Sequence, residues 1–207
     1  MFEQAFKTQL SLLTNDDTLV EKLWGEIKTG YSKKSRHYHN LSHLDNLLAE
    51  LLPLQDTIQD WQTLLFSMAY HDIIYNTLKN DNEQKSAELA IDRLAKLPTP
   101  LSQQEKCFAQ IMATREHSLS GDNDTNLFTD ADLAILGADT DRYNQYAKEI
   151  RREYRFYPDA IYKPGRQKVL QHFLAMPAVY KTSFFHEKYE AQARVNLQQE
   201  WEGLSSR

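Results

Sequence analysis

The sequence predicts an all-α protein, a single-domain helical bundle that covers residues 1–207. Apolar residues recur at the spacing of a helix along most of the chain. The chain contains six glycines and six prolines, too few for a many-stranded β protein, which needs turn residues about every 8–12 positions. A chain of 207 residues with 41% hydrophobic residues is long enough to bury a core of its own.

The first half of the chain contains six predicted helices. Asn40 is placed to cap the third of them, and Ser102 and Glu105 have the spacing of a capping box for the sixth. The apolar stripes lie at 2–13, at 19–27 after the polar segment 15–17, at 44–51 before Pro53, at 64–69 running into His71 and Asp72, at 82–97, and at 108–112.

The second half is predicted to begin with a loop, because residues 118–126 are polar and include Gly121. A short helix over 131–136 follows, ended by Gly137. Three longer helices are expected at about 140–156, 166–175 and 185–202. Pro158, the pair Pro164 and Gly165, and Pro177 are predicted to mark the gaps between them.

Composition limits the classes of protein to consider. The formal net charge of −5 lacks the basic excess of a nucleic-acid surface, so no polymeric nucleic acid is expected as a partner. Cys107 is the only cysteine, which excludes an intrachain disulfide and fits a reducing cytosol. No stretch approaches the ~20 apolar residues of a membrane span, and the first residues lack the pattern of a signal peptide. We therefore expect a cytoplasmic, soluble protein.

Histidines and aspartates gather at the ends of the predicted helices. His37, His39 and His43 lie at the start of the third, His71 and Asp72 at the end of the fourth, and Asp132 beyond the sixth. A lone buried histidine is more often a hydrogen-bonded core residue than a ligand. Groups on separate helices, however, are typical of a metal site inside a bundle. The ligand types suit zinc, iron or manganese, and magnesium where oxygen ligands dominate.

The order His43, His71-Asp72, Asp132 resembles the H…HD…D pattern of the HD phosphohydrolase superfamily. Residues 38–43, Tyr-His-Asn-Leu-Ser-His, resemble the YHNxxH segment of cyclic-nucleotide phosphodiesterases, and residues 130–137 look like the segment that closes the HD motif. Most of the chain is similar to small bacterial proteins described as predicted metal-dependent HD phosphohydrolases. The resemblance implies an HD-type helical bundle.

The resemblance also implies roles for single residues. His43, His71, Asp72 and Asp132 would bind a divalent ion (Mn, Mg, Zn, Fe, Ni or Co), with a second ion and His117 as a further ligand left open. His39 corresponds to the histidine that protonates the leaving oxygen. Asp72 would also position the attacking water or bridge two ions. Glu83 would orient water, or it would simply be a negative charge that the helix dipole favours in the first turn of a helix. Asp130 is predicted to be a helix charge rather than a ligand.

The predicted substrate is a nucleotide or another small phosphorylated metabolite. Its phosphate would be bound by cations, for which Lys163, Arg166 and Arg194 are the candidates. Two other functions stay open at this stage: a non-catalytic metal- or nucleotide-binding regulatory module, and a di-iron oxygenase on the HD scaffold. The sequence leaves the oligomeric state open.

Overall fold

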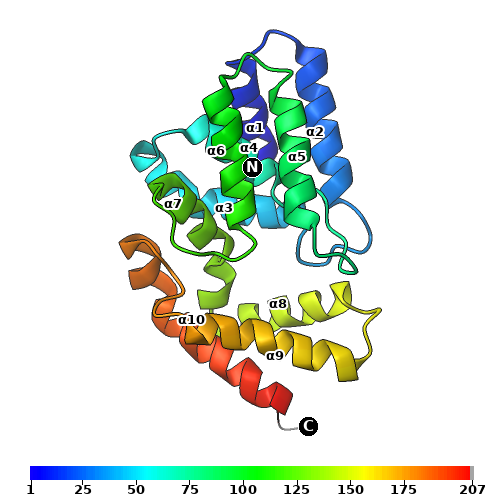
Figure 1. The fold of residues 1–207 in the computed structure, drawn as a ribbon, viewed down its shortest axis with the longest axis vertical. Coiled ribbons are helices and arrows are strands. Elements are labelled where there is room, and N and C mark those ends of the chain that lie inside the picture. Colours follow the sequence, from blue (N-terminus) through cyan, green and yellow to red (C-terminus); the bar gives the residue numbers. More distant parts are fainter. Residues whose placement is uncertain (206–207) are drawn as a thin grey trace. The chain divides into compact units, whose positions relative to one another are not determined.

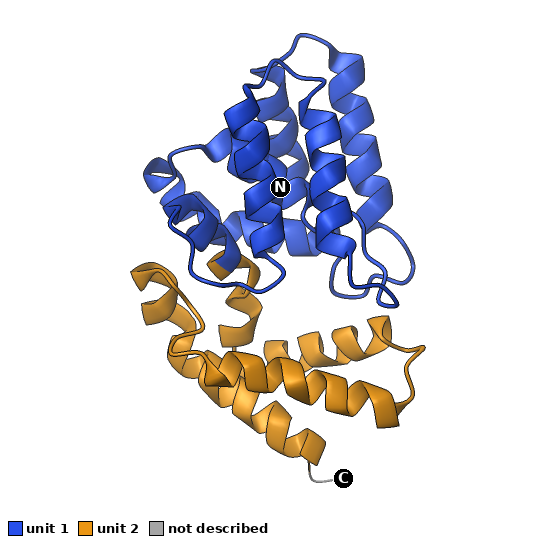
Figure 2. Cartoon of the chain, in the orientation of Figure 1, with its two compact units in different colours: residues 1–129 blue, residues 130–207 orange. Residues whose placement is uncertain are grey.

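The computed structural model describes residues 1–205, and all regular structure in this range is helical. The chain divides into two compact units, residues 1–129 and 130–207 (Figure 2), which we describe separately. The prediction of an all-α protein is confirmed, whereas the extent of a single domain stays a prediction. Among the described residues, no helix has the length and apolar character required to cross a membrane.

Unit 1 is built around α4 (Trp61–Tyr70), whose residues from Thr63 to Tyr70 are all buried. A helix that is apolar on every side belongs in a core, and α4 contacts α1, α3, α5 and α6 (Figure 1). The elements around it are α1 (Phe2–Ser11), α2 (Asp17–Tyr31), α3 (Leu41–Leu51), the 3-10 helix η1 (Leu52–Thr57), α5 (Asn82–Leu94) and α6 (Leu101–Ala113).

Two helix starts test the capping predictions. Asn40 caps α3, because its side-chain oxygen accepts a hydrogen bond from Ser42 N at 2.8 Å. The predicted capping box at Ser102 is wrong: α6 begins at Leu101, and Pro100 precedes it without a side-chain cap. The fixed φ of proline brings the chain into the helix before the serine can act as a cap.

The predicted loop over 118–126 is wrong in its second half, because α7 (Asn123–Asp132) begins there. Asp122 precedes this helix and accepts hydrogen bonds from Thr125 N at 3.1 Å and Thr125 Oγ1 at 2.6 Å. The short helix expected at 131–136 is replaced by the end of α7 and the 3-10 helix η2 (Ala134–Gly137). Helix α7 begins in unit 1 and ends in unit 2.

Unit 2 consists of the end of α7, η2, α8 (Thr140–Glu153), α9 (Asp159–Ala175) and α10 (Ser183–Ser205). Helix α10 packs against both α9 and η2. A Cβ atom on Gly137 would come within 2.5 Å of Tyr189 Cβ, so only glycine allows this approach. The predicted gap at Pro164 and Gly165 is wrong, because both residues lie inside α9. The proline removes one backbone donor from the helix without ending it.

Candidate metal centre

Two buried histidines of unit 1 meet from neighbouring helices. His43 lies in the first turn of α3, and His71 is the residue that caps the end of α4. The distance between His43 Nε2 and His71 Nε2 is 3.2 Å. Asp72, one residue further, places Oδ2 at 3.3 Å from His71 Nε2. Both imidazoles are almost fully buried, while Asp72 is partly exposed.

Helix α4 ends at Tyr70, and His71 and Asp72 follow it directly. His71 keeps helical backbone angles (φ −55°, ψ −40°), and its N donates to Ser67 O at 2.9 Å. The turn that follows is closed by Ile73 N, which donates to Tyr70 O at 3.2 Å. Adjacent residues of a helix start about 100° apart, so the side chains themselves bring Asp72 Oδ2 to 3.3 Å from His71 Nε2.

The protonation state of His71 follows from its other ring nitrogen. His71 Nδ1 lies 2.9 Å from Met68 O, and a carbonyl oxygen can only accept, so Nδ1 carries the proton. In the neutral ring, Nε2 then presents a lone pair toward the Asp72 carboxylate. A proton on His43 Nε2, 3.2 Å away, or a metal ion would satisfy this lone pair, and a metal ion would also neutralise the Asp72 carboxylate at 3.3 Å.

The separations fit a shared metal ion. Two ligand atoms at ordinary metal distances of about 2.0–2.1 Å are about 2.8–3.4 Å apart for octahedral or tetrahedral angles. The separation of 3.2 Å between the histidines and that of 3.3 Å between His71 and Asp72 both fall in this range. A backbone bond from the second ring nitrogen, like that of His71, is also how proteins orient metal-binding imidazoles. The residues present therefore fit a divalent ion.

His39 lies beside this group. Helix α3 begins at Leu41, so His39 lies just before it. The structure brings His39 Nε2 to 3.8 Å from Asp72 Oδ2, and both side chains are partly exposed. The ring packs against Tyr75, with centroids 4.6 Å apart. His39 therefore lies beside Asp72 at a partly exposed edge of the group.

The buried residue Arg36 holds this segment in place, although the sequence analysis did not identify it. Its guanidinium donates to His39 O at 3.0 Å and to Ile73 O at 2.8 Å. It also lies over the rings of Tyr31 and Tyr75, at 4.8 and 5.2 Å from the centroids. Arg36 therefore ties the backbone of the His39 segment to the turn that follows Asp72. An arginine directly before His37, at the start of the histidine-rich segment 37–43, was the available signal.

Comparison of the chain with protein families, curated proteins and solved structures finds no match.

Two further residues predicted for the site, Glu83 and His117, also belong to unit 1. Glu83 is in the first turn of α5, where the helix dipole favours its charge. His117 follows α6 with a φ of 52°, and its backbone N donates to Ala113 O at 2.9 Å. The backbone conformation of His117 is that of a residue that ends a helix.

Two of the three predicted phosphate-binding cations are engaged within unit 2. Arg166 is buried and donates twice to Glu200, at 2.8 Å from both Nε and Nη2. Arg194 donates to Leu174 O and Met176 O at the end of α9, at 2.8 and 2.7 Å. These contacts give both arginines structural roles, whereas Lys163 lines an open groove in the same unit.

Asp130 and Asp132 differ in surroundings. Asp130 is fully buried and accepts hydrogen bonds from Lys181 N at 3.0 Å, Thr182 N at 2.8 Å and Thr182 Oγ1 at 2.8 Å. The prediction that Asp130 is a charge at a helix N-terminus is wrong, since it lies near the end of α7. Its carboxylate anchors the segment before α10. Asp132 is the last residue of α7 and is partly exposed.

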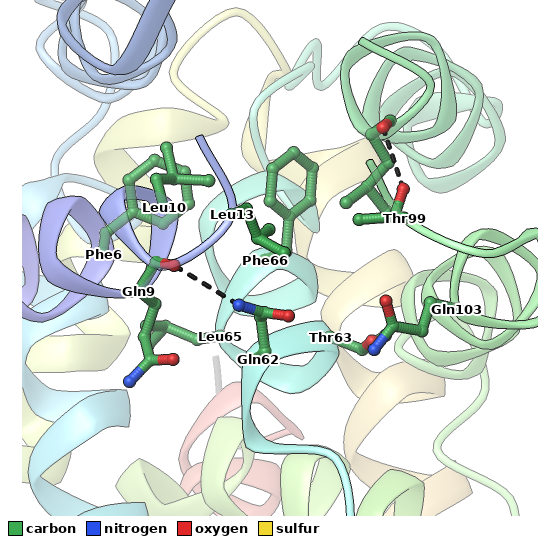
Figure 3. A pocket seen from close by; sticks show the side chains of 11 residues that line it. Phe6, Gln9, Leu10, Leu13, Gln62, Thr63, Leu65, Phe66, Thr99 and Gln103 are labelled. Carbon is green, nitrogen blue, oxygen red and sulfur yellow. Dashed lines mark hydrogen bonds between the residues drawn. The ribbon is translucent and has the colours of Figure 1, made fainter. Parts of the chain in front are cut away.

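A small pocket elsewhere in unit 1 has no role in this chemistry (Figure 3). It is lined mainly by apolar side chains of α1 and α4, including Phe6, Leu10 and Phe66. Its volume of about 10 Å³ is at the lower limit for a single water molecule. It is a packing defect of the core and is too small for a substrate.

Proposed function

We propose that this protein is a metal-dependent phosphohydrolase of the HD type, with a divalent ion held by His43, His71, Asp72 and Asp132. The approach of His43, His71 and Asp72 carries this proposal, because a second imidazole nitrogen and a carboxylate oxygen lie 3.2 and 3.3 Å from His71 Nε2. His43, His71 and Asp132 are also a combination of ligand types that suits a metal ion. An HD-type bundle is proposed on the same residues.

The chemistry that this site would perform is hydrolysis of a phosphate ester. A bound divalent ion would stabilise negative charge on the phosphoryl group and acidify a water molecule. Asp72, partly exposed beside His71, is placed to accept a hydrogen bond from that water. His39 would hold a proton for the leaving oxygen, because its Nε2 lies 3.8 Å from Asp72 Oδ2 and its side chain is partly exposed.

Other assignments belong to the proposal as well. Glu83 is proposed to orient water, and His117 to bind a second ion if one is present. The candidates for the substrate phosphate are Lys163, Arg166 and Arg194, of which both arginines already have protein partners and Lys163 lines the groove of unit 2. The substrate proposed is a nucleotide or a small phosphorylated metabolite.

Metal content tests the centre. His71→Ala and Asp72→Ala should each lose most of the bound metal while circular dichroism remains helical, since ligands share one ion. His172→Ala is the matched control, because His172 is exposed on α9 and its loss should leave the metal content unchanged. The protein would be purified, supplemented with Mn, Fe or Zn, and analysed for elements. Wild-type occupancy in both site variants would refute the proposed centre.

Turnover tests the role of His39. His39→Ala should retain the metal and slow hydrolysis of alkyl phosphate esters by about 10²–10⁴-fold, the usual effect of general acid catalysis. The loss should be much smaller for p-nitrophenyl esters, whose leaving group needs no proton. An unchanged ratio of the two rates would remove His39 from this role. Metal binding without any turnover would favour a regulatory module, and two irons with oxygen consumption would favour an oxygenase.

A further inference from the structure

Unit 2 contains an open groove between α8, α9 and α10 that is separate from the residues of the candidate metal centre. Its volume of about 560 Å³ lies within the usual range of about 300–1,000 Å³ for small-molecule sites. Figure 1 shows α8 alongside α9 in this unit. The groove is lined by charged residues from all three helices, which are Lys148, Arg151, Asp159, Lys163 and Glu200.

Both acidic residues of the groove are already neutralised by arginines. Asp159 Oδ1 accepts from Arg151 Nη2 at 2.7 Å and Nε at 3.2 Å. Glu200 accepts two hydrogen bonds from Arg166 and a third from Tyr143 Oη at 2.5 Å. Neither carboxylate therefore has its charge available to repel an anion.

The two lysines of the groove are not neutralised in this way. Within residues 1–205, neither Lys148 nor Lys163 forms an ion pair, although Lys85, Lys96, Lys106 and Lys181 all do. The surrounding sequence is also basic: residues 142–168 contain eight lysines and arginines against three acidic residues. The groove thus carries a local positive charge in a chain whose net charge is −5.

The wall of the groove between the lysines is rigid and partly aromatic. Arg151 Nη1 donates to Tyr154 O at 3.0 Å, and its guanidinium lies 4.5 Å from the ring centroid of Tyr162. The phenol of Tyr162 is neutral at physiological pH, since its ordinary pKa of about 10 is already well above 7 and burial raises the pKa further, to about 12. These contacts hold Arg151 against Tyr162 in the wall of the groove, so this part of the wall needs little ordering when a ligand binds.

We infer that this groove binds a small ligand that carries at least two phosphate charges and has about the size of a nucleotide, with Lys148 and Lys163 contacting the phosphates. Two lysines on separate helices can contact two phosphates or two faces of one diphosphate. The volume leaves room for a further group beside a diphosphate. The inference does not depend on the proposed phosphohydrolase activity, because every residue that carries it lies on α8, α9 or α10.

Calorimetric titration of the full chain with ADP tests the inference, in buffer with a chelator so that metal does not contribute. ADP should bind, adenosine should not, and added salt should weaken binding because the contacts are ionic. Lys148→Gln and Lys163→Gln should each weaken binding about tenfold, the lower range for a hydrogen bond to a charged group. Lys168→Gln is the matched control, since Lys168 is exposed on α9 but does not line the groove.

The titration separates this site from the metal centre. His71→Ala should retain ADP binding even though it loses metal, and pyrophosphate should compete with ADP. Equal binding of ADP and adenosine would overturn the inference, as would the absence of saturation at millimolar ADP. Unchanged affinity in the Lys148→Gln, Lys163→Gln double variant would also overturn it.

Discussion

Replacement of Asp130 by asparagine should destabilise the protein without removing metal. The carboxylate is fully buried, accepts hydrogen bonds from Lys181 N, Thr182 N and Thr182 Oγ1, and forms an ion pair with Lys181 Nζ at 2.9 Å. The ion pair lacks the alignment of a hydrogen bond, so its attraction is electrostatic. Asp130→Asn keeps the shape of the side chain but leaves the buried ammonium without a counter-charge.

The expected cost follows from these contacts. Removing one partner of a buried ion pair typically costs about 3–5 kcal/mol, and the asparagine oxygen would retain part of the hydrogen bonding. We therefore expect a loss of about 3 kcal/mol, a large part of the ~5–15 kcal/mol that stabilises a typical domain. Urea unfolding of the metal-free protein measures it. The double variant Asp130→Asn, Lys181→Met should recover part of the loss, because it removes the uncompensated charge.

Asp132→Asn is the matched comparison, two residues along α7. If Asp132 is a ligand, this variant should lose metal affinity and should unfold at a higher urea concentration than Asp130→Asn. A free energy of unfolding for Asp130→Asn within about 0.5 kcal/mol of wild type, the range of ordinary surface substitutions, would refute the reasoning. The reverse ranking in a metal titration would show that Asp130 is the ligand.

Three further outcomes are expected. Gly137→Ala should destabilise the protein by about 1–3 kcal/mol in urea unfolding, because its Cβ would meet the Tyr189 backbone. Gly165→Ala is the control and should be neutral or stabilising, because a Cβ at this position in α9 meets open space. Equal effects of the two substitutions would contradict the close packing of Gly137 against Tyr189. Burial raises the pKa of the Cys107 thiol to about 12. The free energy of unfolding should therefore fall as the pH rises above the ordinary thiol pKa, because only the unfolded chain ionises there. Thiol reagents should label the native protein no faster than it unfolds. Burial opposes ionisation of Glu190, but hydrogen bonds from residues 179 and 180 and from Arg194 keep its pKa below the ordinary 4.5. The stability that this carboxylate contributes should therefore be lost as the pH falls below 4.5 and through the lowered pKa. Glu190→Gln should flatten this dependence of the free energy of unfolding on pH.

Local signals predicted the helices well where an apolar stripe and a capping residue agreed. The third predicted helix had both, and α3 begins directly after its cap, Asn40. The prediction failed for α7, because this helix is polar in composition and yet buried from Asp124 to Ala131. No apolar stripe marks such a helix, and only the spacing of Asp122 and Thr125 pointed to its start. The predicted helix break at Pro164 also failed, because the loss of a single backbone hydrogen bond does not end a helix that packs against α10.

The candidate site was predicted by residue type more than by geometry. The sequence identified His43, His71 and Asp72, which the structure brings together. It did not reveal that α4 ends at Tyr70 or that Asp72 Oδ2 comes within 3.3 Å of His71 Nε2. Asp130 could not be assigned either, because its partners lie 51 and 52 positions away. Contacts at such a distance along the chain leave no local pattern.

Helix α7 limits where this polypeptide can be divided into fragments. Near its start, Asp124 accepts hydrogen bonds from Gln59 N and Asp60 N in unit 1, and near its end Asp130 is bound to Lys181 and Thr182 in unit 2. A cut between residues 129 and 130, where the two units divide, would sever the helix and leave each half too short to form alone. The exposed stretch around Leu119 precedes the helix, so split reporters, circular permutants and inserted tags are better placed there.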